Sequence, residues 1–134
     1  MIAVAQNPYY EFSYDPAKNR LYFKFLGYWK SPDVVPDYLQ EWGHVIKLTK
    51  PGFTIVADVR NMITHPREVK QLHEKAIDLC IIAGVSHIAE VTPADKIAVL
   101  QTTGMADKAQ LSYNRFPDVA SADAYLDQLY SYTF

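Results

Sequence analysis

Alternating hydrophobic and polar residues predict a β-hairpin near the start of the chain. From Tyr9 to Asp15, apolar and polar positions alternate, as they do in a strand with one buried face. Turn-forming residues follow up to Asn19, and Arg20–Trp29 is a second run that is dense in aromatic residues. Two such runs joined by a short turn predict an antiparallel pair of strands.

Hydrophobic residues at helical spacing predict a first helix that ends before Pro51. Ser31 is the expected N-cap, and Pro32 stands at the first helical position, where a missing N–H costs nothing. Pro36 lies within the first turns and is expected to delay or bend the start. The residues expected to face inward are Val35, Leu39, Trp42, Val45 and Ile46.

A short buried strand and a second helix are predicted next. Phe53–Val59 is rich in β-branched residues and bounded by turn formers, which is typical of a central strand. Residues 60–65 are expected to form a connection, and Pro66 to start a helix with Gly84 as its C-cap. The apolar stripe of that helix is Val69, Leu72, Ala76, Leu79, Cys80 and Ala83.

The last third of the chain continues the alternation of strands and helices. His87–Val91 is a predicted strand. The stretch Lys96–Ala109 fits either a strand over Ile97–Leu100 or one helical face, and we prefer the helix. Leu111–Phe116 is a predicted last strand, and Ser121 is expected to cap a terminal helix.

This order of elements predicts one α/β domain over residues 1–134. A hairpin followed by alternating strands and helices indicates a mostly parallel sheet with one antiparallel edge strand and about four helices. Because crossover connections are right-handed, few windings of such a sheet are available.

Composition excludes several classes of protein. The 134 residues are 49% hydrophobic, which suits a soluble globular domain, and 13 basic against 15 acidic residues argue against binding to nucleic acid. No apolar run is long enough to span a membrane. The first residues have no basic region and too few apolar residues for a signal peptide, so we expect a cytoplasmic protein.

Residues that could carry catalysis or bind a metal are sparse. The four histidines, His44, His65, His73 and His87, show no metal-ligand spacing, and we expect His44 and His73 to be surface or capping residues. Cys80, the single cysteine, lies on an apolar stripe and is expected to behave as a small hydrophobic residue. No nucleophile elbow, phosphate-binding glycine loop or dinucleotide fingerprint is present. We therefore expect no enzyme, cofactor or metal site.

The order of elements resembles the STAS or SpoIIAA-like domains, which include the anti-sigma-factor antagonists and many uncharacterised bacterial relatives. The resemblance extends from about Tyr9 to Leu129. It rests on the hairpin, on Gly27 at the end of the second strand, on a buried strand that ends at Asp58 and on a late helix near Val119–Leu126. It implies a regulatory or ligand-binding module that is not an enzyme.

In the sporulation antagonists, a serine at the start of the helix after the central strand is phosphorylated. Counted from Asp58, the corresponding positions fall on residues 66–69, which carry no hydroxyl group. Thr64 is the nearest hydroxyl and is therefore the candidate for phosphorylation, where a helix N-terminus and Arg67 would favour added negative charge. The alternative is that Thr64 or His65 only caps the helix.

The same connection holds the best polar cluster of the chain. In open α/β sheets, ligands bind outside the carboxyl ends of the strands, where these residues should stand. The cluster is predicted to bind a small anion or an acidic group of a partner, although Asp58 and Arg60 alone would also fit a simple surface ion pair. Its members are Asp58, Arg60, Asn61, Thr64, His65 and Arg67.

Aromatic residues are concentrated in the hairpin. Since side chains of a strand alternate, we expect rings on both faces, of which one packs on helices. The other face would then form a homodimer interface or a groove for an apolar ligand, unless helices cover both faces. The rings are those of Tyr9, Tyr10, Phe12, Tyr14, Tyr22, Phe23, Phe25, Tyr28 and Trp29.

Two functions follow as hypotheses. The first is a regulatory protein-interaction module, controlled by phosphorylation, with residues 58–67 as its contact edge. The second is a carrier or sensor of a small apolar or lipid-like molecule held between the sheet and the helices. The partners expected are thus a protein or a small ligand, with neither nucleic acid nor a membrane span.

Overall fold

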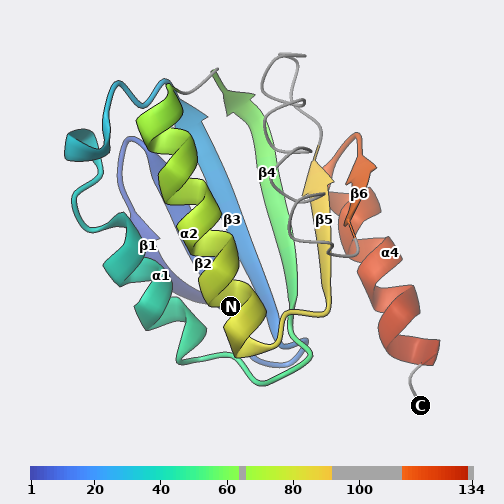
Figure 1. Ribbon diagram of the computed structural model, residues 1–134. Helices are drawn as coiled ribbons and strands as arrows, with labels where there is room; N and C mark the ends of the chain where they lie inside the picture. The colour runs from blue at the N-terminus through green and yellow to red at the C-terminus, as the bar shows by residue number, and fades with distance from the viewer. Residues whose placement is uncertain (64–65, 92–112, 133–134) are drawn as a thin grey trace.

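The computed structural model of the protein describes residues 1–63, 66–91 and 113–132. Its centre is a six-stranded sheet in which the strands follow one another in sequence order (Figure 1). The strands are β1 (Ile2–Gln6), β2 (Tyr10–Asp15), β3 (Arg20–Gly27), β4 (Thr54–Met62), β5 (His87–Val91) and β6 (Tyr113–Phe116).

The sheet is mixed. β2 pairs antiparallel with both β1 and β3, whereas β3, β4, β5 and β6 pair in parallel. The prediction of one antiparallel edge strand was therefore wrong in one respect, because β1 pairs outside β2 and becomes the edge. The run Ile2–Gln6 lacks the polar alternation that identified β2, so only its pairing with β2 shows it as a strand.

Three α-helices lie among the described residues: α1 (Tyr38–Ile46), α2 (Arg67–Ala83) and α4 (Val119–Tyr132). The expected helix at Ser31 is a single 3₁₀ turn, Pro32–Val34, and the α-helix starts only after Pro36, whose ring disfavours helical backbone at the preceding residue. Gly84 ends α2 in the left-handed conformation (φ 94°), as predicted. The helix expected over residues 96–109 lies outside the described residues.

The cap of α4 differs from the prediction. The helix is capped by the carboxylate of Asp118 and not by the hydroxyl of Ser121. Asp118 Oδ1 accepts a hydrogen bond of 2.7 Å from the backbone N–H of Ser121, which has no partner within the first turn of the helix. The helix starts three residues earlier than expected, since the cap is Asp118 and not Ser121.

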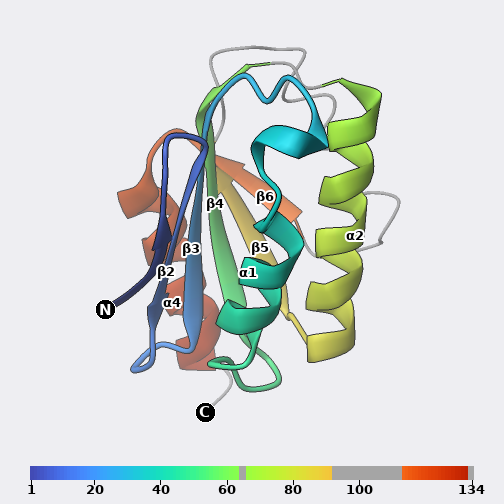
Figure 2. The same ribbon diagram turned by 90° about the vertical axis from the view of Figure 1, so that its left-hand side faces the viewer.

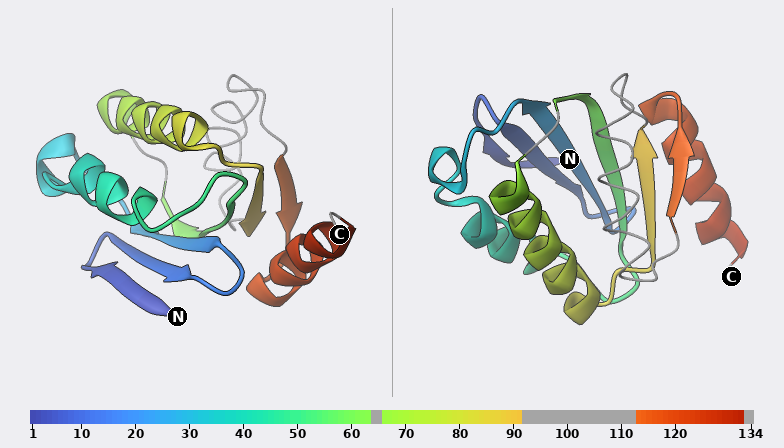
Figure 3. Two further views of the ribbon diagram at one scale, coloured as in Figure 1. Left: turned by 90° about the horizontal axis from the view of Figure 1, so that it is seen from below. Right: turned by 45° about the horizontal axis from the view of Figure 1, so that its top comes forward.

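The helices form layers on both sides of the sheet. α1 and α2 lie side by side on one face and α4 lies on the other (Figures 2 and 3). Right-handed crossovers between strands that progress in one direction place α1 and α2 on the same face. α4 follows β6 and does not connect two parallel strands, so this rule does not fix its side. It packs on the opposite face, where it covers apolar residues of β4 and β5.

The core between the sheet and the first two helices is an aromatic layer. Phe23 is its centre, with ring centroids 4.4 Å from Phe12, 4.3 Å from Phe25 and 5.2 Å from Trp42. Most rings of β2 and β3 occupy alternate positions and point to this face, but Tyr22 points to the opposite face, where it contacts Asp123 of α4. The expectation of rings on both faces is therefore confirmed. Since α4 contacts Tyr22, helices lie on both faces of the sheet, which is the alternative to an exposed aromatic face, and dimerisation stays a prediction.

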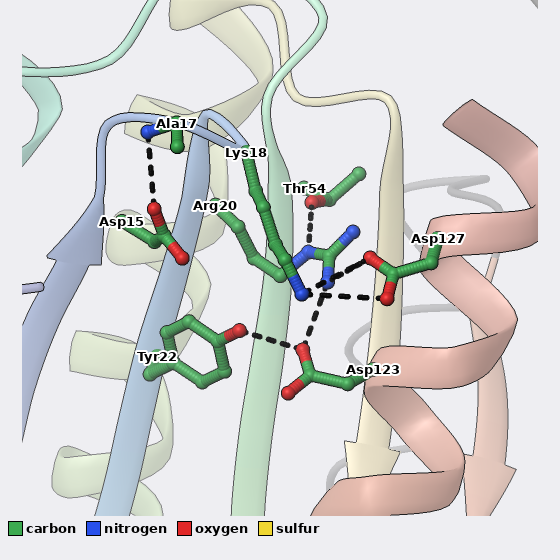
Figure 4. Close-up of polar contacts among 8 residues, drawn as sticks. All are labelled: Asp15, Ala17, Lys18, Arg20, Tyr22, Thr54, Asp123 and Asp127. Atoms are coloured by element: carbon green, nitrogen blue, oxygen red, sulfur yellow. Dashed lines mark hydrogen bonds and ion pairs between the residues drawn. The ribbon is translucent and has the colours of Figure 1, made fainter. Parts of the chain in front are cut away.

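Charged groups attach α4 to the sheet. Arg20, at the start of β3, has a side chain only 2% exposed, and its Nη1 donates to Asp123 Oδ1 (2.8 Å) and to Asp127 Oδ1 (2.9 Å), as Figure 4 shows. Tyr22 donates a second hydrogen bond, of 2.6 Å, to Asp123 Oδ1. We call Arg20, Tyr22, Asp123 and Asp127 the α4 anchor. Two aspartates one helical turn apart thus bind one buried guanidinium.

Truncation of Phe23 tests the aromatic layer. Phe23→Ala removes a ring that touches five others, and we expect it to lower the free energy of unfolding by about 3–5 kcal/mol. Urea denaturation measures the loss. Tyr28→Ala, at an exposed ring, is the control and should cost under about 0.5 kcal/mol. Equal losses in the two variants would contradict this account of the core.

Acid should weaken the α4 anchor. Burial alone would raise the pKa of the Asp127 carboxyl, but its hydrogen bonds with Arg20 and Lys18 outweigh burial and hold the pKa below the ordinary value of 3.8. A lowered carboxyl pKa stabilises the fold above the ordinary pKa, and this stabilisation is lost as the pH falls through the lower folded value. Asp127→Asn should therefore lower the free energy of unfolding by under about 1 kcal/mol near neutral pH, because Asp127 is half exposed. Near pH about 3 the same substitution should lower it by less.

Urea denaturation of both proteins at the two pH values measures this difference. Asp78→Asn on α2, with an exposed side chain, is the control and should change the free energy of unfolding by under about 0.5 kcal/mol. A cost of Asp127→Asn that is the same at both pH values would refute the assignment.

Candidate functional site

Asp58 and Arg60 form a bidentate ion pair on β4. Arg60 Nε donates to Asp58 Oδ1 at 3.0 Å and Nη2 donates to Oδ2 at 2.8 Å, and the backbone N–H of Arg60 donates to Oδ1 as well. Burial alone would raise the pKa of Asp58, but the hydrogen bonds from Arg60 outweigh it and lower the pKa. The carboxylate stays charged and holds the guanidinium in one orientation.

The structure places the other predicted site residues apart. Arg60 and Asn61 belong to β4, which extends to Met62 and not to Val59 as expected, because a bulge opposite β3 lets the pairing continue to Gly27. Arg67 is the first residue of α2, on the other face of the sheet. Thr64 and His65 lie outside the described residues, so phosphorylation of Thr64 stays a prediction.

The ion pair is instead part of a polar hollow on the α4 side of the sheet. Three of its residues are direct cross-strand neighbours: Glu11 on β2 lies opposite Lys24 on β3, which lies opposite Asp58. We call Glu11, Lys24, Asp58 and Arg60 the charged row. The hollow above it measures about 280 Å³, and Ser13, Tyr22, Val56 and Val119 also line it.

Lys24 was missed in the sequence because its neighbours are distant in the chain. None of the described residues forms a hydrogen bond or a close ion pair with its ammonium group. Its positive charge contributes to the lowered pKa of Asp58. Charges therefore alternate across the sheet, with negative Glu11, positive Lys24, negative Asp58 and positive Arg60.

A second hollow lies on the opposite face, between the sheet and helices α1 and α2. It is an apolar cavity of about 70 Å³. Tyr38 and His73, both buried, border it and share a hydrogen bond of 2.9 Å between the phenol oxygen and Nδ1. The expectation of a surface or capping role for His73 was thus wrong, because this residue lies on the side of α2 that packs on the ring of Tyr38.

Cys80, the single cysteine of the chain, is buried. Burial raises the pKa of the Cys80 thiol to about 12, so this residue is an inert part of the core, as predicted. Within residues 1–63, 66–91 and 113–132, no three His, Cys, Asp or Glu side chains are placed to hold a metal ion. In the same residues, no helix is long and apolar enough to cross a membrane.

Comparisons with known proteins support the fold. No protein-family model matches the chain, and no curated protein matches it either. A solved structure does: an uncharacterised protein of the DUF3478 family with a SpoIIAA-like fold, from Shewanella loihica PV-4. The TM-score is 0.61 at 11% identity, over 91% of this chain and 97% of the other. The resemblance inferred from the order of elements is therefore confirmed at the level of architecture: the chain has a SpoIIAA-like fold.

Proposed function

We propose that this protein is a non-enzymatic regulatory module that binds a protein partner through the charged row. The carrying observation is that Lys24 and Arg60 lie in an open hollow, on a part of the sheet that α4 leaves uncovered. A sheet face with a helix over only part of it offers room beside that helix for a segment of another protein.

The charges favour a protein over a free anion. Each cation of the row has a carboxylate as its neighbour, since Glu11 and Asp58 flank Lys24 and Asp58 binds Arg60. A small anion would meet attraction and repulsion in nearly equal measure. A protein segment can instead present an acidic side chain to Lys24 and a basic one to Glu11, and gain from both.

The Arg60 guanidinium is prepared for such a contact. Asp58 takes Nε and Nη2, and no described residue accepts a hydrogen bond from Nη1. The Arg60 side chain is 42% exposed, so this nitrogen can donate to a partner without rearrangement of the pair. Preorganisation of this kind lowers the cost of binding.

A charge swap tests the proposal. Glu11→Lys combined with Lys24→Glu keeps the net charge and leaves opposite charges at these two facing positions. The new carboxylate at position 24 lies opposite Asp58, but Arg60 still pairs with Asp58, so the fold should be retained. The order of charges is reversed, however, and we expect binding of the partner to weaken about 10-fold or more. The measurement is quantitative affinity capture from the native host, with the wild type and the swapped protein side by side.

A matched swap on another face is the control. Lys70→Glu combined with Glu74→Lys reverses a neighbouring pair on α2, away from the charged row. A partner of the charged row should be captured equally by this control and by the wild type, and be lost from the first swap. A capture profile that is the same for all three proteins would refute the proposal.

The apolar cavity supports a second candidate function. Its lining by rings and aliphatic side chains, with Tyr38 and His73 at its border, suits a small apolar molecule. Its volume of about 70 Å³ is roughly half that of an engineered cavity known to hold benzene, so it would receive a small molecule or the end of a larger one.

Filling the cavity tests this second function. Ala76, on α2, lines the cavity, and Ala76→Leu places added methyl groups inside it. We expect the free energy of unfolding to stay within about 1 kcal/mol of wild type and any host-derived ligand to disappear from native mass spectra. A loss of stability above about 2 kcal/mol would show that no usable space exists there.

A further inference from the structure

A third hollow lies at the opposite end of α4 from the charged row. It is formed where the turn after β2, the loop before β4 and the start of β5 meet the second half of α4, and it measures about 350 Å³. That volume lies in the range of sites for small molecules, roughly 300–1,000 Å³. Pro51, Leu126 and Leu129 supply apolar walls, and Lys18, Asn19, Arg20, Gly52, Thr54, Ser86 and His87 complete the lining.

Arg20 brings an unused donor to this hollow. Its Nε donates to Thr54 and its Nη1 donates to Asp123 and Asp127. No described residue accepts a hydrogen bond from Nη2, although the residue as a whole is 99% covered. In Figure 4 this third nitrogen points away from Asp123, on the side of β5. Nη2 is not fully enclosed, so it can donate to water or to a molecule bound in the hollow.

The charges around the hollow select the ligand. Arg20 and Lys18 are positive, Asp123 and Asp127 are negative, and all four are joined by ion pairs of 2.8 to 3.3 Å. An added anion would be repelled by the two aspartates, and an added cation would be repelled by Arg20 and Lys18. A neutral oxygen acceptor satisfies Nη2 without disturbing this balance.

We propose that this hollow binds a small, mostly apolar molecule whose neutral carbonyl oxygen accepts a hydrogen bond from Arg20 Nη2, while its apolar body packs on Leu126 and Leu129. The site is separate from the charged row and does not depend on the function proposed for it. Arg20 then has two roles, since one nitrogen anchors α4 and another binds the ligand.

A series of probes of matched shape tests the charge argument. Benzamide offers a neutral carbonyl, benzoate is its anionic counterpart, benzamidine is its cationic counterpart and ethylbenzene has no acceptor. For fragments of this size we expect a dissociation constant of about 1–10 mM for benzamide, and binding about 10-fold weaker for each of the other three. Titration followed by the ¹⁵N–¹H resonances of the arginine side chains measures both affinity and contact with Arg20.

Two variants locate the binding. Leu129→Trp fills the hollow without touching the anchor and should weaken benzamide binding about 10-fold or more. Arg20→Lys keeps one positive charge for the aspartates but removes Nη2, so benzamide should bind no better than ethylbenzene. Since Arg20→Lys also affects the α4 anchor, circular dichroism is recorded for both variants. If Arg20→Lys does not fold, the result with Leu129→Trp by itself decides the test.

Three results would overturn the proposal. Benzoate or benzamidine binding as tightly as benzamide would refute the charge argument. Benzamide binding that survives Leu129→Trp would place the probe elsewhere. Absence of any shift with benzamide up to about 50 mM would show that the hollow does not bind neutral carbonyl compounds.

Discussion

The two-residue alternation of β2 and β3 sets the layout of the molecule. Every second side chain of these strands is a ring or an aliphatic group that packs under α1 and α2, and burial of this aromatic layer provides much of the hydrophobic free energy of the fold. The intervening positions, Glu11, Ser13, Tyr22 and Lys24, must then point to the other face. The polar surface is thus a geometric consequence of the core.

α4 depends on that polar surface in turn. Its apolar contacts are made by Ala122 and Leu126, which are buried, and by the partly buried Val119, Tyr125 and Leu129. The buried Arg20 adds the directional contacts that position the helix over β4 and β5, since a guanidinium with two carboxylates and a hydroxyl around it allows few orientations. The same attachment separates the two hollows on this face, one near the start of α4 and one near its second half.

The SpoIIAA-like fold by itself assigns no activity, because sites and not folds carry function. The strands follow one another in sequence order, so no reversal of strand order creates the crevice in which open α/β sheets usually bind ligands. This explains why the polar cluster predicted at the carboxyl ends of the strands is divided in the structure. Asp58 and Arg60 join Glu11 and Lys24 on one face, while Arg67 starts a helix on the other.

The sequence by itself determined most of the elements. Local patterns sufficed for the hairpin, for the central strand, for α2 with its C-cap at Gly84 and for the α/β class, because these depend on the alternation or helical spacing of neighbouring residues. They also identified Cys80 as a core residue. What they could not supply was β1, whose pairing with β2 defines it, or the side of α2 on which His73 lies relative to Tyr38.

Tertiary structure alone decided the candidate sites. Glu11, Lys24 and Asp58 come from three strands whose register places them in one row, and Arg20 meets Asp123 and Asp127 across more than 100 residues of chain. Ion pairs and hydrogen bonds require atoms within a few ångströms, and no local pattern specifies which distant residues folding will bring to that distance. The sequence therefore determined the elements, and their packing determined which charges meet.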